Sequence, residues 1–139
     1  MTPLVVDCSV TMAWYFEDEC DELADAVLDA LADGGAWVPS LWPLEVANVL
    51  VAAERRRRLT PADSARFIEL LMSLPIVVDE RSHERALSQV LAVARQVGIS
   101  VYDASYLELA MRLGATLATR DAQLQAAAAA AGVPLFAAQ

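Results

Sequence analysis

The sequence contains no lysine, and all ten of its basic residues are arginines. This absence excludes Walker-type phosphate loops and Schiff-base chemistry, and it removes the lysine that most phosphoryl-transfer sites use. The sequence also contains a single histidine, His83. It falls at the start of an expected helix, far along the sequence from Cys8. A nucleophilic cysteine at that position therefore has no evident base.

Cysteine and long apolar runs are also sparse. The two cysteines, Cys8 and Cys20, are too few for a disulfide scaffold and lack metal-site spacing, so they fit a reducing compartment. No apolar run approaches the roughly 20 residues that a membrane-spanning helix needs. The start, MTPLVVDCSV, has no basic region followed by a long apolar stretch and is not expected to be a signal peptide. We therefore expect a cytoplasmic protein without a membrane partner.

The composition indicates one soluble globular domain, expected to span residues 1–139. The chain is 57% hydrophobic and 21% charged, and its 139 residues are enough for a single core. The formal net charge of −9 argues against simple nucleic-acid binding, because nucleic-acid binders are usually basic. This argument weakens if many of the acids surround metal ions.

Short apolar strands alternate with helical segments along the chain. The expected strands are 4–7, 36–39, 76–79, 115–119 and 133–136. The expected helices are 21–35, 43–58, 61–74, 82–98, 102–113 and 121–131. Glycines at several helix ends and a proline in the first turn at Pro43 support these boundaries. The alternation predicts an α/β domain with a mainly parallel sheet and short connections.

Four carboxylates fall where the predicted strands end. Asp7 ends the first strand, and Asp121 closely follows the fourth. Glu45 lies in the first turn of the helix after the second strand, and Asp103 opens the helix over 102–113. Ligands of open parallel sheets bind beyond the carboxyl ends of the strands. One site is therefore predicted to contain all four acids.

A group of four facing carboxylates suits a divalent cation. The acids repel one another, and a hard cation relieves that repulsion. Oxygen ligands without a cysteine or histidine cluster favour Mg²⁺ or Mn²⁺ over zinc. Such ions activate water and stabilise an in-line displacement at phosphorus. The pattern thus predicts a Mg²⁺ site that Mn²⁺ can also occupy.

Each acid also has a purely structural interpretation. Asp121, in TRDAQL, is a good helix N-cap, and Asp103 and Glu45 suit the positive end of a helix dipole. Asp7 is expected to have no such role, because no helix cap is predicted before CSVT. The placement of all four acids together, more than that of any single one, favours the metal site.

Other residues near the strand ends leave alternatives open. Ser9 and Thr119 either orient the nearby carboxylates or bond the local backbone. Asp79 ends IVVD much as Asp7 ends LVVD, but it is interpreted as a solvated strand end. A haloacid-dehalogenase-like phosphatase has a second aspartate where this chain has Ser9. The lysine that such a phosphatase or a phospho-receiver domain uses is missing.

Four segments resemble the successive motifs of PIN-domain proteins, in particular of VapC-type toxins from bacterial toxin–antitoxin pairs. The segments are VVDCSVTMAWYFEDE, WVPSLWPLEVANVL, VYDASYLELAMRLGATLATRD and GVPLF. The resemblance runs from Leu4 to about Phe136. It implies a three-layer α/β/α domain and an endoribonuclease that hydrolyses RNA phosphodiester bonds with metal-activated water. It also implies a cognate antitoxin protein as a partner.

The resemblance assigns roles to individual residues. The motif acids, implied to be catalytic and to bind the metal, are Asp7, Glu45, Asp103 and Asp121. The frequent supporting polar positions are Ser9, Asn48 and Thr119. Because all four acids are present, nothing in the sequence suggests a catalytically inactive member.

A catalytically silent protein-binding module of the same fold is the alternative. The helical segment over 43–53 is apolar almost all round, which is typical of a deeply buried helix or of an interface. Three aromatic residues lie near it in the sequence, namely Trp14, Phe16 and Trp42. These features predict a homodimer.

Arg56 is a candidate RNA-binding residue. It follows Glu45 by eleven residues, so it returns to nearly the same helix face about 16 Å further along. We expect it to contact RNA backbone or an acidic partner. The alternative is a solvated cation at the negative end of the helix dipole.

Overall fold

The computed structural model describes residues 2–16 and 21–137. Its central sheet has four strands, all parallel, in the order β3-β2-β1-β4. The strands are β1 (Leu4–Val6), β2 (Ala36–Pro39), β3 (Ile76–Asp79) and β4 (Thr116–Ala118). The predicted parallel sheet is confirmed, and β1 lies at its centre between β2 and β4.

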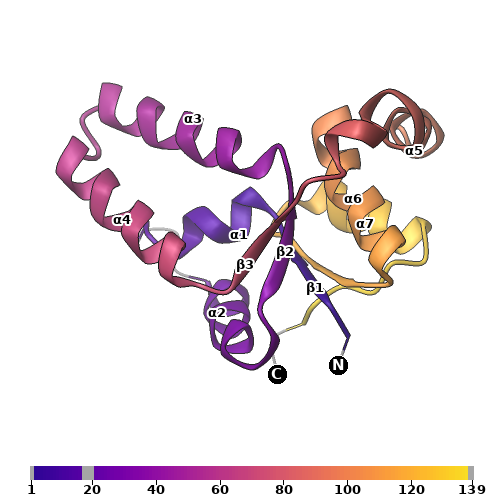
Figure 1. Cartoon of the computed structure of the whole chain (residues 1–139), viewed down its shortest axis with the longest axis horizontal. Helices are drawn as coiled ribbons and strands as arrows, with labels where there is room; N and C mark the ends of the chain where they lie inside the picture. The colour runs from indigo at the N-terminus through magenta and orange to yellow at the C-terminus, as the bar shows by residue number, and fades with distance from the viewer. Residues whose placement is uncertain (1, 17–20, 138–139) are drawn as a thin grey trace.

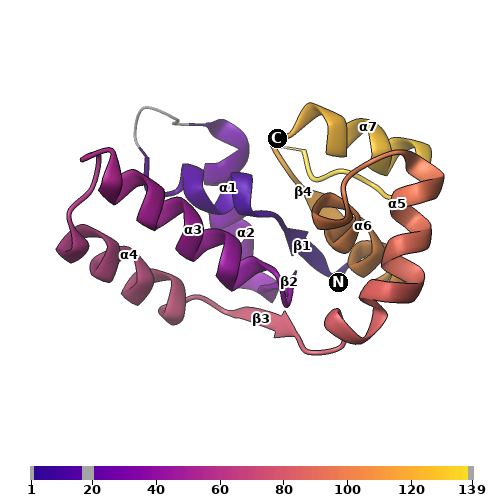
Figure 2. The same cartoon turned by 90° about the horizontal axis from the view of Figure 1, so that it is seen from above.

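Helices cover both faces of the sheet (Figures 1 and 2). The helices are α1 (Cys8–Ala13), α2 (Glu22–Gly34), α3 (Trp42–Arg55), α4 (Pro61–Ser73), α5 (Leu91–Val97), α6 (Val101–Leu113) and α7 (Ala122–Ala130). Figure 1 shows α1 to α4 on one side and α5 to α7 on the other. The predicted three-layer α/β/α arrangement is therefore confirmed.

Helix α6 is the most deeply buried helix of its layer. It packs against β1, β2 and β4, and its apolar residues from Ala104 to Ala110 are almost wholly enclosed. Burial on more than one face explains why its sequence is apolar without a clear stripe. No helix in the described part of the chain is both long and apolar enough to cross a membrane.

The close pairing of β2 with β3 depends on Gly35. This residue has a φ of 70°, and a Cβ there would lie 2.5 Å from the carbonyl oxygen of Pro75. The adjacent amide of Ala36 donates a hydrogen bond to that same oxygen at 3.0 Å. A side chain at Gly35 would therefore push the two strands apart where they begin.

Three predicted elements differ from the observed ones. The segment predicted as one helix over 82–98 forms a 3-10 turn, η2 (His83–Arg85), then a π-helical segment, η3 (Ala86–Val90), and then α5. The predicted strand over 133–136 is reduced to a single parallel bridge between Leu117 and Leu135. Helix α3, predicted to reach residue 58, ends at Arg55, the first of four consecutive arginines, and Arg57 adopts a positive φ of 59°.

Candidate active site

The carboxyl ends of β1 and β4 meet at one edge of the sheet. The two strands pair in register from Leu4 with Thr116 to Val6 with Ala118. Just beyond them, the amide of Asp7 donates to the carbonyl oxygen of Ala118 at 3.1 Å. The residues that follow β4 therefore lie beside Asp7.

The side chain of Asp7 is buried, and both of its carboxylate oxygens accept hydrogen bonds. One carboxylate oxygen accepts from Ser9 Oγ at 2.7 Å and from the amide of Val10 at 3.1 Å, and the other accepts from Thr119 Oγ1. The bond from Val10 makes Asp7 the N-cap of α1. The expectation that Asp7 has no capping role is thus wrong. The reason is that α1 has six residues, too short for its apolar periodicity to be recognised in the sequence.

Ser9 and Thr119 join the two strand ends across the sheet. Ser9 Oγ accepts from the amide of Arg120 at 3.0 Å, while its own hydrogen is donated to Asp7. Thr119 Oγ1 accepts from the amide of Asp121 at 3.0 Å and likewise donates to Asp7. Each hydroxyl thus satisfies a backbone amide and orients the carboxylate at the same time, although only the amide bound by Thr119 is local in the sequence.

Asp121 combines a structural contact with an electrostatic one. Its carboxylate accepts from the amide of Gln123 at 2.9 Å, so it is the N-cap of α7. Its charge also raises the pKa of Asp7 and of Asp103. The capping interpretation and the shared site are therefore compatible.

Glu45 is held by a residue that the sequence analysis did not identify. It lies in the first turn of α3, and Tyr106 Oη on α6 donates a hydrogen bond to Glu45 Oε1. Burial and the charges of Asp7 and Asp103 raise the pKa of Glu45, while the bond from Tyr106 opposes the rise. Tyr106 follows Asp103 by three residues, so it lies on nearly the same face of α6. This spacing of three residues from Asp103 is the signal in the sequence from which Tyr106 could have been identified.

Asp103 lies in the first turn of α6 and is not its N-cap. Ser100 is the N-cap and accepts from the amide of Asp103 at 3.1 Å. At the same position of α4, the side chain of Asp63 bonds back to the amide of Thr60 and completes a capping box. Within the described residues the carboxylate of Asp103 forms no such bond, so it remains available to the site. Burial, Asp121 and Asp7 raise its pKa.

The four acids influence one another through their charges. Burial is the largest cause of the raised pKa of Asp7, Glu45 and Asp103, and neighbouring acids add to each shift. In the described part of the chain, the side chains do not form a group of three ready to hold a metal ion. The donor set nevertheless fits a hard cation, because oxygen ligands and mutual repulsion are what Mg²⁺ neutralises.

The thiol of Cys8 is unsuited to chemistry here. Burial, followed by the charges of Glu45 and Asp7, raises its pKa to about 12, so it stays protonated at neutral pH. Cys20 lies outside the described residues.

Comparison with known proteins identifies the family. The PIN domain profile matches residues 4–130. The chain belongs to the PIN-domain family. The protein named Ribonuclease VapC3 from Pyrobaculum aerophilum is 32% identical over 121 residues, which cover 87% of this chain and 91% of that relative. Ribonuclease VapC27 from Mycobacterium tuberculosis is 38% identical over 79 residues, which cover 57% of each protein.

A solved structure shares this PIN fold. The crystal structure of PAE2754 from Pyrobaculum aerophilum matches with a TM-score of 0.67 and 27% sequence identity. The match covers 91% of this chain and 79% of that one. The arrangement of the sheet and helices is therefore one found among solved proteins.

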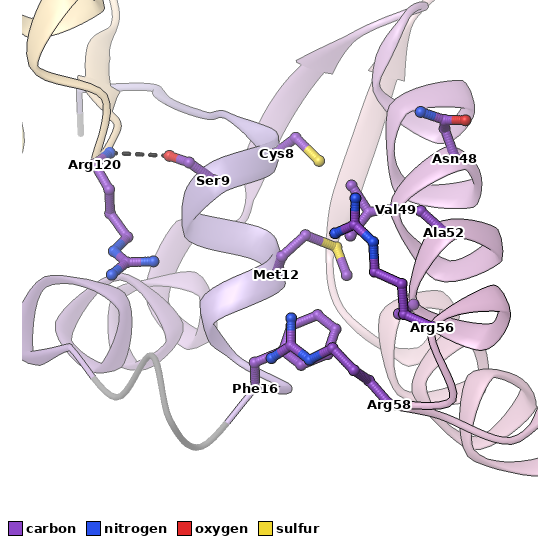
Figure 3. Close-up of a pocket in the computed structure, with 11 residues that line it drawn as sticks. Cys8, Ser9, Met12, Phe16, Asn48, Val49, Ala52, Arg56, Arg58 and Arg120 are labelled. Carbon is purple, nitrogen blue, oxygen red and sulfur yellow. Dashed lines mark hydrogen bonds between the residues drawn. The ribbon is translucent and has the colours of Figure 1, made fainter.

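Two further candidates, Asn48 and Arg56, belong to the same helix as Glu45, with Asn48 about one turn further along and Arg56 at the C-cap. Both line a cleft between α1 and α3 (Figure 3). Asn48 makes no hydrogen bond to any of the four acids among the described residues. No hydrogen bond among the described residues therefore supports the predicted role of Asn48 in orienting the carboxylates.

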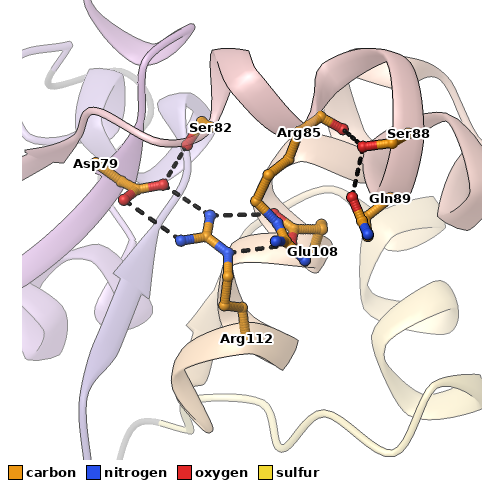
Figure 4. A network of polar contacts seen from close by, with 7 residues as sticks. All are labelled: Asp79, Ser82, Arg85, Ser88, Gln89, Glu108 and Arg112. Carbon is orange, nitrogen blue, oxygen red and sulfur yellow. Dashed lines mark hydrogen bonds and ion pairs between the residues drawn. The ribbon is translucent and has the colours of Figure 1, made fainter.

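Asp79 is not the solvated strand end that its sequence position suggested. It is 6% exposed and accepts from Ser82 Oγ at 2.6 Å and from Arg112 Nη2 at 2.7 Å. Arg112 also pairs with Glu108, which in turn binds Arg85 (Figure 4). Although burial alone would raise the pKa of Asp79, the bonds from Arg112 and Ser82 hold it below its usual value. Asp79 is thus structural.

The contact between Tyr106 and Glu45 gives a first prediction. Replacing Tyr106 by Phe keeps the buried ring but removes the donor, and we expect cleavage or metal affinity to fall by about 10- to 100-fold. The loss also raises the pKa of Glu45, because the bond favours the carboxylate. The acid limb of metal binding then moves to higher pH. Metal titrations followed by melting temperature, at several pH values, measure both effects.

Tyr102→Phe is the matched control. Tyr102 is on the same helix and 63% exposed, so its hydroxyl supports no buried acid. Equal metal affinity and equal rates for Tyr106→Phe and Tyr102→Phe would show that the bond to Glu45 does not position it.

Proposed function

We propose that this PIN-domain protein is an endoribonuclease and the toxin of a toxin–antitoxin pair. Its four acids, Asp7, Glu45, Asp103 and Asp121, would hold Mg²⁺, with Mn²⁺ as a substitute. The observation that supports this most is the buried Asp7 at the junction of β1 and β4, within the field of the other three acids. The names of the VapC relatives supply the RNA-cleaving activity.

The chain prepares this site by fixing its carboxylates. Ser9 and Thr119 hold both oxygens of Asp7, and Tyr106 holds one oxygen of Glu45. These carboxylates would hold a cation, which would supply an activated water and neutralise charge that develops at phosphorus. Without it, the acids repel an RNA phosphate, so we expect no cleavage in EDTA.

The test is cleavage of total cellular RNA with Mg²⁺, Mn²⁺ or EDTA, followed by sequencing of the new ends. New ends should form with either metal, and they should be absent in EDTA and with Asp7→Asn. Metal binding by the wild-type chain without any new RNA ends would instead support the silent protein-binding module.

A cognate antitoxin is the second partner that we propose. The acidic site suits a basic side chain from such a protein, inserted among the carboxylates. Co-expression with the product of the adjacent reading frame should give a stable complex with suppressed cleavage. Recovery of the two proteins separately, without mutual binding, would remove this partner. The cytoplasm, where both RNA and a reduced Cys8 are expected, remains the predicted location.

The homodimer also remains a prediction, but the structure favours a different contact surface from the one suggested by the aromatic residues. Phe16 and Trp42 are buried in the core and are not available to a second chain. Three exposed apolar residues, Leu44, Val101 and Tyr102, line one largely apolar cleft of about 290 Å³ and offer a surface instead. A standard interface buries roughly 1,600 Å² in total. We expect light scattering at micromolar concentration to give twice the chain mass.

A charge placed on that surface should dissociate the dimer. Leu44 is 72% exposed, so Leu44→Glu leaves the fold intact and should yield monomers. Met72→Glu, at a position on α4 that is 81% exposed, is the control and should remain dimeric. A monomeric wild-type protein contradicts the prediction.

A further inference from the structure

A buried chain of hydrogen bonds joins α1 to α3 beside Asp7. Trp42 is the first residue of α3, and its indole Nε1–H donates to Thr11 Oγ1 on α1 at 3.0 Å. Thr11 Oγ1 donates in turn to the backbone carbonyl oxygen of Asp7 at 2.9 Å. The chain therefore runs from the residue that follows β1 to the start of the helix that carries Glu45.

The surroundings of this chain exclude water. Thr11 is fully buried, and Asp7 and Trp42 are 5% and 8% exposed. Because water cannot replace a lost partner there, removal of one group leaves the other unsatisfied. The indole N–H only donates and the carbonyl only accepts, so the direction of both bonds is fixed. The contact therefore holds α1 and α3 in one relative placement at this point.

The start of α3 depends on this contact more than other helix starts would. Its N-cap residue, Leu41, makes no side-chain capping bond, and Pro43 follows in the first turn. Side chains do cap the helices α1, α2, α4, α6 and α7. Such caps fix the backbone where a helix begins. At α3 the bond from Trp42 instead fastens the first turn to a neighbouring helix.

Glu45 belongs to the turn that Trp42 fastens. It follows Trp42 by three residues, so the two side chains lie on nearly the same face of α3. The amide of Glu45 donates across this turn to the carbonyl oxygen of Leu41 at 3.1 Å. Its carboxylate accepts from Tyr106 of α6. Glu45 is thus held through its backbone from α1 and through its carboxylate from α6.

We infer that Trp42 and Thr11 are positioning residues for the metal site. Their hydrogen bond sets how far Glu45 lies from Asp7. The inference rests on the proposed function, in which both acids are metal ligands. Trp42 and Thr11 do not contact the cation or the RNA, and each acts through the backbone of an acid. Because Mg²⁺ demands nearly ideal octahedral geometry, a small displacement of one ligand weakens its binding.

Removal of the indole donor is the central experiment. Trp42→Phe keeps an aromatic ring and loses the N–H. We expect the dissociation constant for Mn²⁺ alone, obtained from titrations followed by melting temperature, to rise by about 10- to 100-fold. Thr11→Val keeps the shape of the side chain and removes the hydroxyl, so its effect should be of the same size. Thr11→Ser retains the hydroxyl and should bind Mn²⁺ nearly as the wild type does.

Trp14→Phe separates positioning from a general loss of stability. The indole Nε1–H of Trp14 also donates one hydrogen bond, to the carbonyl oxygen of Ala24 at 2.9 Å. That bond joins the end of α1 to α2, which carries none of the four acids. Trp14→Phe should therefore lower the melting temperature in EDTA, as Trp42→Phe does, and leave the dissociation constant for Mn²⁺ unchanged.

The double variant, Thr11→Val with Trp42→Phe, tests whether the two residues act through one bond. Once either partner is lost, the bond is absent, so the second substitution should weaken Mn²⁺ binding little further. Fold-losses that multiply in the double variant would mean that the two side chains act independently, and the inference would be wrong.

Hydrogen exchange of the Glu45 amide in EDTA gives a readout that needs no metal. In the wild type this amide is protected by its bond to Leu41. We expect Trp42→Phe to speed its exchange through local opening by about fivefold, the change that one lost hydrogen bond produces. Trp14→Phe should leave this exchange rate unchanged. Equal exchange rates in Trp42→Phe and the wild type would show that the indole does not hold this turn.

Failure of the inference differs from failure of the proposed function. A wild-type chain that does not bind Mn²⁺ removes the metal site and the proposed function together. If the wild type binds Mn²⁺ and Trp42→Phe has the same dissociation constant as Trp14→Phe, the inference is overturned while the metal site stands. If Trp42→Phe does not fold, the comparison of Thr11→Val with Thr11→Ser decides, because a hydroxyl that positions Glu45 restores Mn²⁺ binding.

Discussion

Substitution of Asp103 by Asn is expected to abolish RNA cleavage and, in EDTA, to raise the melting temperature. Its carboxylate makes no capping bond within the described residues, and burial, Asp121 and Asp7 raise its pKa. Removing that charge relieves repulsion in the metal-free protein. It also removes a proposed ligand, so the stabilisation gained from Mg²⁺ or Mn²⁺ should shrink. Calorimetry with EDTA or metal, together with RNA end sequencing, measures all three effects.

Asp63→Asn is the matched control for this prediction. Both acids stand three residues after the N-cap of a helix, but Asp63 completes a capping box and has a lowered pKa. Its substitution should lower the melting temperature and leave cleavage intact. Asp79→Asn is unsuitable, because Asp79 is buried against Arg112. A lower melting temperature in EDTA for Asp103→Asn, with normal metal response and cleavage, would make it a helix-start residue and remove the proposed site.

The largest expected loss of stability follows from replacing Arg112 by Ala. Arg112 pairs with Asp79 at 2.7 Å and with Glu108 at 3.1 Å, and both acids are almost completely buried. The substitution leaves buried charge without its partner, which typically costs about 3–5 kcal/mol. The free energy of unfolding, measured by urea denaturation, should fall by this amount. Arg85 still pairs with Glu108 at 2.6 Å. Asp79 is therefore the acid whose buried charge is affected most when Arg112 is removed.

Two controls separate charge burial from a general effect of losing arginine. Arg66→Ala removes an exposed pair with Asp63 and should cost less than about 1 kcal/mol. Adding Asp79→Asn to Arg112→Ala should restore part of the lost stability, because it removes the uncompensated charge. If the double variant is as unstable as the sum of the two single ones, the buried ion pair is not the cause.

The sequence by itself determined the features that depend on neighbours along the chain. Alternating strands and helices gave the parallel α/β class, because each element has its own period of apolar residues. The positions of Asp7 and Asp121 at strand ends followed from the rule that parallel strands present their carboxyl ends at one edge. The bounds of α4 followed too, because the predicted helix over 61–74 agrees with the observed Pro61–Ser73 to within one residue.

Only the tertiary structure decided the features that depend on distant partners or on very short elements. Helix α1 has too few residues to show a period, so the cap at Asp7 was hidden. Asp79 and Arg112 are far apart in the sequence, as are Glu45 and Tyr106, and no local pattern pairs them. Folding brings Tyr106 of α6 to Glu45 of α3, and it brings Arg112 of α6 to Asp79 at the end of β3. Burial at these contacts then shifts the pKa of the side chains. Because a pKa depends on the surroundings of a group in the folded protein, it cannot be read from the sequence.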